Sequence, residues 1–183
     1  YEIHSSRMWQ QAQVDLAMDF MVKHGMNALI FHQNDLVEQL VFPEAYFDND
    51  MMWDNWPVRR QGVLYQRDYI NQVIKKAQQL NIDFYLEIKE LDVVDAIFEI
   101  KPDLRGADGT ICPNHPFWTA FLEEKFSELF FVYPDIAGII VSPGTRESAV
   151  SIAANRCHCE RCQNTPALNW YINILKAMYK PIH

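Results

Sequence analysis

The chain has 183 residues, of which 49% are hydrophobic and 13% aromatic, so it is long and apolar enough to bury one sizeable core. Sixteen basic residues stand against twenty-four acidic residues, which gives a formal net charge of −8. Because the lysines and arginines are also scattered, this balance excludes nucleic acid and anionic membranes as partners. A single domain spanning residues 1–183 is therefore expected.

Short apolar runs alternate along the chain with patterns of helical spacing. Strands are expected at residues 2–5, 28–33, 83–89 and 138–142. Helices are expected to end at Gly25 and to cover residues 69–81, 93–100, 116–131 and 168–178. Between them, residues 36–60 form an insertion rich in aromatic and acidic residues, which is typical of a functional loop. The alternation predicts four βα units with parallel strands and helices outside.

Four βα units make half of an eightfold barrel, which takes about 250 residues. The predicted fold class is therefore α/β, a (β/α) barrel of the TIM type, present as a half-barrel fragment. Either more chain completes such a fragment, or half-barrels associate with each other. The alternative is an open four-stranded parallel sheet, whose apolar edges would have to be covered.

The strand at residues 83–89 alternates between apolar and polar side chains. Phe84, Leu86 and Ile88 share one face, and if that face meets the helices, Glu87 and Lys89 point toward the middle of the sheet. Charges are rarely left unpaired at such positions. The two residues are therefore expected either to pair with each other or to contact a substrate.

Polar and aromatic residues follow the predicted strands and fill the insertion, and functional residues of parallel sheets collect at the carboxyl ends of strands. Aromatic rings stack on the C–H faces of sugars, which makes a carbohydrate the expected ligand. An arginine beside a tryptophan suits a uronic acid, although Arg59 and Arg60 fit a solvated helix start equally well. The candidate substrate-binding residues are Arg7, Trp9, His32, Asn34, Asp35, Trp53, Asp54, Trp56, Arg59, Lys89, Glu90 and Arg146.

Three of the four cysteines crowd into one short segment, as Cys157, Cys159 and Cys162. Three thiolates at this spacing can converge on one tetrahedral ion, with Cys112 or His158 as the fourth ligand. The segment follows the last predicted strand, where it would hold a loop in place, and this favours a structural zinc over a catalytic one. Thiols without a metal, or one disulfide, are the alternatives.

The stretch from Pro113 through the strand 138–142 to Glu147 resembles the N-terminal part of the glycoside hydrolase barrel of family 67 α-glucuronidases. The chain is more distantly similar to family 20 hexosaminidases, whose adjacent Asp-Glu pair it lacks at this strand end. In family 67 a similar helix, turn and strand lead to Asn-Ser-Glu, whose glutamate is the general acid. The resemblance implies that role for Glu147, which here follows Thr145 and Arg146. It also implies a periplasmic or secreted location.

Hydrolysis of a glycoside needs a second carboxylate across the sugar from the acid. Family 67 places it beyond the fourth strand, and within this chain Glu87 is the catalytic candidate, with Glu90 and Asp35 as alternatives. The sequence therefore predicts a glycoside hydrolase fragment that acts on polysaccharide or oligosaccharide and is inactive alone. A non-catalytic carbohydrate-binding or interaction domain with a structural zinc site is the alternative.

Overall fold

The protein contains one sheet of four parallel strands, seen here in a computed structural model that describes residues 1–33, 36–89, 91, 93, 95–106, 108–144, 150 and 156–182. The strands are β1 (Glu2–His4), β2 (Ala28–His32), β3 (Asp83–Lys89) and β4 (Gly138–Ser142). Their order in the sheet follows the sequence, and each neighbouring pair is parallel. The predicted α/β class and the four predicted parallel strands are confirmed.

The predicted TIM-type barrel is wrong, because the sheet is open. Within the described residues, β1 pairs with β2 alone and β4 pairs with β3 alone, so each outer strand has one edge without a neighbour. Strands that alternate with helices build open sheets as well as barrels, so the local pattern could not separate the two. The open four-stranded sheet, which was the alternative, describes the observed topology.

The helices confirm most of the expected spans. They are α1 (Gln11–Lys23), α2 (Asn49–Asn55), α3 (Pro57–Gln79), α4 (Ala96–Ile100), α5 (Phe117–Val132), α6 (Glu160–Gln163) and α7 (Ala167–Tyr179), with 3-10 turns η1 (Ser5–Trp9), η2 (Val37–Gln39), η3 (Pro102–Leu104) and η4 (Lys180–Ile182). Gly25 follows α1 with a φ of +67°, as expected of a residue that ends a helix. Helix α3 begins earlier than predicted, because its first turns are polar and only Pro57 marks its start.

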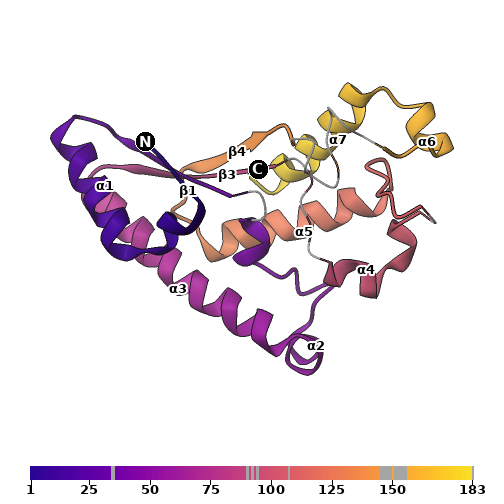
Figure 1. Ribbon diagram of the computed structural model, residues 1–183, viewed down its shortest axis with the longest axis horizontal. Coiled ribbons are helices and arrows are strands. Elements are labelled where there is room, and N and C mark those ends of the chain that lie inside the picture. Colours follow the sequence, from indigo (N-terminus) through magenta and orange to yellow (C-terminus); the bar gives the residue numbers. More distant parts are fainter. Residues whose placement is uncertain are drawn as a thin grey trace.

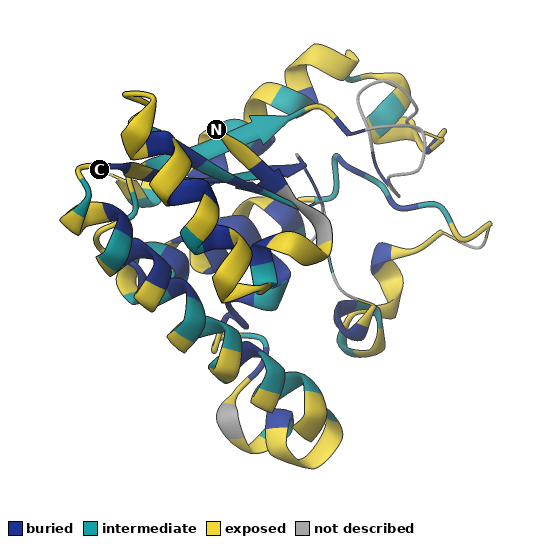
Figure 2. Ribbon diagram, turned by 60° about the vertical axis from the view of Figure 1, so that its left-hand side comes forward, coloured by how far each residue is buried: buried dark blue, intermediate teal, exposed yellow. Residues whose placement is uncertain are grey.

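The two faces of the sheet differ in what covers them. Helices α1, α3 and α5 lie on the same side of the sheet, and α7 runs beside α5 (Figure 1). On that side Phe31 and Phe84 are fully enclosed and pack edge to face, with ring centroids 4.9 Å apart. On the other side Ile30, His32, Tyr85 and Glu87 are half-buried, and β4 is half-buried along its whole length (Figure 2).

We call this second side the open face. The strand register places the following residues on it: Glu2, Ile30, His32, Tyr85, Glu87, Lys89, Gly138, Ile140 and Ser142.

The insertion packs onto the helices through buried charges. Glu38 of η2 is 2% exposed and accepts a hydrogen bond from Lys125 Nζ of α5, which is 4% exposed. Arg59 donates to the Glu38 carbonyl oxygen over 2.9 Å. Nearby, Arg67 pairs with Glu128 and donates to the carbonyl oxygen of Leu40. Much of the insertion is therefore part of the core, and these ion pairs fix its path between α3 and α5.

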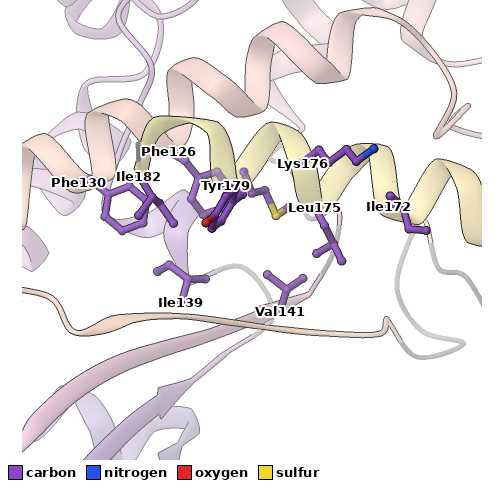
Figure 3. A pocket seen from close by; sticks show the side chains of 10 residues that line it. Phe126, Phe130, Ile139, Val141, Ile172, Leu175, Lys176, Tyr179 and Ile182 are labelled. Carbon is purple, nitrogen blue, oxygen red and sulfur yellow. The ribbon is translucent and has the colours of Figure 1, made fainter.

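An apolar groove of about 350 Å³ lies between β4 and the helices α5 and α7 (Figure 3). Ile139 and Val141 point from β4 into it, toward Phe126 of α5 and Leu175 of α7. Helix α7 thus packs along α5 and leaves the strand partly uncovered. Among the described residues, no helix has both the length and the hydropathy needed to cross a membrane.

Replacing Lys125 with Met should destabilise the protein by roughly 3 kcal/mol, because the buried Glu38 carboxylate loses its closest cation and keeps only Arg59, 3.7 Å away. Lys180→Met is the matched control, since Lys180 pairs with Glu123 at the surface over 2.7 Å and should cost about 1 kcal/mol or less. Urea unfolding followed by circular dichroism measures both. If both variants lose the same free energy of unfolding, the Glu38–Lys125 pair stabilises the protein no more than a surface salt bridge does.

Candidate functional site

A row of polar side chains crosses the open face. Glu87 is half-buried at the middle of β3, and its carboxylate accepts a hydrogen bond from the Ser142 hydroxyl of β4. On the opposite side of Glu87, the His32 imidazole of β2 lies with Nδ1 3.0 Å from a carboxylate oxygen of Glu2 in β1. All four strands thus contribute to one row, in which each residue is placed by backbone pairing.

Lys89 and Tyr85 flank Glu87 on the same strand and the same face. Lys89 is 9% exposed, and none of the salt bridges formed between described residues includes it. The Tyr85 ring lies across Gly138, where an added Cβ would come within 3.4 Å of two ring carbons. Glycine at this position therefore lets an aromatic ring lie close to the sheet. Along β3 the open face therefore carries an aromatic ring (Tyr85), a carboxylate (Glu87) and an ammonium group (Lys89) in that order.

Several predicted site residues reach this face or its rim. His32, Glu87 and Lys89 lie on it. The alternation of β3 indicated this face for Glu87 and Lys89, and His32 was proposed because it ends its predicted strand. Trp9 lies in η1 next to the end of β2, where its Nε1 donates to the side chain of Gln33 over 3.2 Å. Arg7 lies in the same turn and is exposed to solvent.

The predicted residues of the insertion lie elsewhere. Trp53 and Asp54 are exposed on α2, which Figure 1 shows at the opposite end of the molecule from the sheet. Trp56 packs edge to face with Phe47, with ring centroids 5.8 Å apart. The Arg59 guanidinium binds Glu38. The structure does not bring these four predicted residues to the open face.

Other predicted residues lie outside the part of the chain that the structure describes: Asn34, Asp35, Glu90, Arg146 and Glu147. Conversely, the open face includes Glu2, Tyr85 and Ser142, which the sequence-based site left out. Tyr85 shares the period of Glu87 and Lys89, so the alternation of β3 already carried the signal for it. Glu2 and Ser142 had no comparable local signal, because only strand pairing places them beside His32 and Glu87.

A second group of candidate site residues forms what we call the cysteine cluster: Cys112, Cys157, Cys159 and Cys162. Their sulfur atoms all lie within 4.8 Å of one another, with Cys112 Sγ 3.4 Å from Cys159 Sγ and 3.6 Å from Cys162 Sγ. None of these four cysteines forms a disulfide. Sulfur atoms this close can share one metal ion, so the four residues form a candidate metal centre.

The turn before α5 carries Cys112 to the other three cysteines. Residues Arg105 and Ile111 form an antiparallel bridge, and Gly109 has a φ of +78° in the tight turn between them. Beyond the bridge, the carbonyl oxygen of Cys112 accepts a hydrogen bond from Trp118 Nε1 over 2.8 Å. The buried indole of α5 thereby fixes the backbone of Cys112, the member of the cluster that is distant in sequence from the other three.

The environments of the four thiols are unequal. Burial raises the pKa of Cys112 and also that of Cys157. A hydrogen bond from the Cys162 backbone N–H lowers the pKa of Cys159 to about 7. His158 is exposed and its ring is not part of the cluster, so of the two candidates for the fourth ligand the structure places Cys112 there.

Of the three comparisons with known proteins, the comparison of structures finds a similar fold. No family model matches the chain, and no curated protein matches it by sequence. A solved glycoside hydrolase, described as a GH138 enzyme targeting pectin rhamnogalacturonan II, is similar in structure with a TM-score of 0.57 and 15% sequence identity. The match covers 100% of this chain and 20% of that enzyme, so this chain spans about one fifth of its length.

A likeness at this identity shows the fold alone. The fold of the chain is thus similar to part of a glycoside hydrolase, which agrees with the resemblance noted in the sequence at its coarsest level. The comparisons give no support to the narrower resemblance to family 67 or family 20.

Replacing Cys112 with Ser should remove the metal that copurifies with the protein, because it takes one sulfur from the set of four. His158→Ala should retain the metal, since its ring lies outside the cysteine cluster. Elemental analysis of protein purified without added metal measures both. The metal centre would be refuted by metal-free wild-type protein whose melting temperature is unchanged by a chelator.

Proposed function

We propose that the chain is part of a carbohydrate-active protein of the glycoside hydrolase class, with the open face as its sugar-binding surface. The observation that carries the proposal is the row of polar side chains on that face, in a sheet whose fold resembles part of a GH138 enzyme along the whole chain. Parallel sheets bind ligands beyond the carboxyl ends of their strands, and Lys89 and Ser142 are the last residues of β3 and β4.

Glu87 supplies the carboxylate of the proposed site. The Ser142 hydroxyl donates to it, so the side chain is held in one position, as a base, a nucleophile or an acceptor for sugar hydroxyls must be. The general acid is proposed to be Glu147, on the resemblance of its surroundings to family 67. Two carboxylates with these separate roles would satisfy the chemistry of glycoside hydrolysis.

The ligand we propose is an acidic sugar. Lys89 places an ammonium group in a largely enclosed position on the open face, and none of the salt bridges between described residues includes it. A uronic acid carboxylate would pair with this ammonium group. The structurally similar enzyme is described as targeting the pectin rhamnogalacturonan II. The Tyr85 ring beside Glu87 offers a surface on which a sugar ring can stack.

The cysteine cluster is proposed to hold a structural zinc ion. Four thiolates at about 2.3 Å from one tetrahedral zinc lie about 3.7 Å from one another, close to the 3.4 Å and 3.6 Å observed. Four protein ligands leave no position for substrate, as in structural sites. The ion would tie the turn before α5 to the segment that follows β4.

The binding of an acidic pectic oligosaccharide tests the proposed surface. Lys89→Met should weaken binding roughly tenfold to a hundredfold, because a charged hydrogen-bonding partner is lost. Lys75→Met is the control, since Lys75 is exposed on α3 and far from the strand face. Isothermal titration calorimetry measures both affinities. If the two variants lose affinity equally, Lys89 has no specific role and general electrostatics explains the binding.

Hydrolysis tests the proposed acid, and the assay should use the longest natural polypeptide that contains the chain. Glu147→Gln should slow substrates with poor leaving groups by roughly 10²–10⁴-fold, because their departure needs a proton. Aryl glycosides with good leaving groups should slow much less. A uniform small loss would exclude Glu147 as the acid. Oligosaccharide binding without any hydrolysis would favour the non-catalytic binding domain instead.

A further inference from the structure

We propose that Glu2, His32 and Glu87 form a binding site for a divalent cation on the open face, separate from the cysteine cluster. One ligand atom from each of the three residues lies within 4.8 Å of the other two, and His32 Nδ1 is 3.0 Å from Glu2 Oε1. Ligands about 2.1 Å from one ion lie about 3 Å apart when adjacent and about 4.2 Å apart when opposite. The observed spacing is close to this range.

Backbone pairing brings the three side chains together. His32 and Glu87 are direct register partners on β2 and β3, and Glu2 of β1 pairs with Ile30, two residues before His32 on the same face. Neighbouring strands are about 4.8 Å apart, so side chains from three adjacent strands can surround one ion without any change in the backbone. The site is therefore preformed by the sheet.

The charge of the group also favours a cation. A pair formed by His32 and Glu2 alone would be an ordinary salt bridge, but Glu87 brings a second carboxylate to the same imidazole. Lys89, the nearest cation along β3, is two residues further toward the end of the strand, where its backbone is in register with Ser142 of β4. Two negative charges and one imidazole thus meet on the β1 side of Glu87.

The ligand chemistry separates this site from the cysteine cluster. One imidazole nitrogen and two carboxylates suit Mn²⁺, Fe²⁺ or Zn²⁺, whereas four thiolates select zinc and related soft ions. Three protein ligands on a half-exposed face also leave coordination positions for water or sugar hydroxyls. The inference does not depend on the proposed function, since it concerns the cation alone. With a cation bound, the Glu87 carboxylate serves as a metal ligand, and the general acid and the nucleophile are then other residues.

Manganese titration tests the site without any sugar present. Protein whose cysteine cluster is loaded with zinc is mixed with Mn²⁺, and the electron paramagnetic resonance signal of free Mn²⁺ reports binding. Because thiolates hold zinc far more tightly than manganese, the cluster should not compete. We expect one Mn²⁺ per chain.

His32→Gln and Glu87→Gln should each weaken manganese binding at least tenfold, and more if both oxygens of Glu87 coordinate. Asp83→Asn is the matched control, because it removes one carboxylate from the exposed start of the same strand and should leave the affinity unchanged. Circular dichroism checks that each variant is folded. If the Glu87 variant fails this check, Glu2→Gln decides, because Glu2 is exposed on the outer strand.

Two results would overturn the site. One is a wild-type protein that binds no Mn²⁺ at millimolar concentration. The other is unchanged Mn²⁺ affinity in the folded His32→Gln variant and in the folded Glu87→Gln variant, or in Glu2→Gln where that variant replaces Glu87→Gln.

Discussion

The structure depends on a parallel sheet with its helices α1, α3 and α5 on one side. In most all-parallel sheets helices cover both faces, so the sequences of the strands are near-continuous apolar runs. Here β3 alternates, so that Phe84, Leu86 and Ile88 enter the core while Glu87 and Lys89 lie on the open face. Because the backbone register is shared across the four strands, one alternation sets the position of every polar group on that face.

Two other devices hold the chain around this sheet. Buried ion pairs, above all Glu38 with Lys125, anchor the insertion between the second strand and α3. The cysteine cluster brings the turn before α5 together with the segment around α6. Both groups of contacts join segments that lie far apart in sequence.

Features that arise from local sequence could be predicted. The apolar runs identified the four strands, Gly25 identified the end of a helix, and the alternation of β3 identified the face of Glu87 and Lys89. Whether the outer strands pair with further strands depends on contacts between residues far apart in sequence, which a local pattern does not contain. For that reason the sequence predicted a barrel, whereas the sheet is open.

The remaining differences also come from long-range contacts. The insertion was interpreted as a functional loop because its aromatic and acidic residues resemble a ligand site. The partner that buries Glu38 is Lys125, 87 residues further along the chain, and no local pattern connects them. In the same way Glu2 and His32 are 30 residues apart and meet only through the pairing of β1 with β2. Cys112 and His158 were equal candidates until the turn before α5 placed Cys112 beside the other sulfurs.

The central claim is that the open face of the sheet is the functional surface of this chain. The most direct test is nuclear magnetic resonance of labelled protein titrated with an acidic pectic oligosaccharide. We predict that the largest chemical-shift changes fall on the open face, at Tyr85, Glu87, Lys89 and Ser142. Saturable changes confined to the groove between β4, α5 and α7, with these four residues unaffected, would contradict the claim.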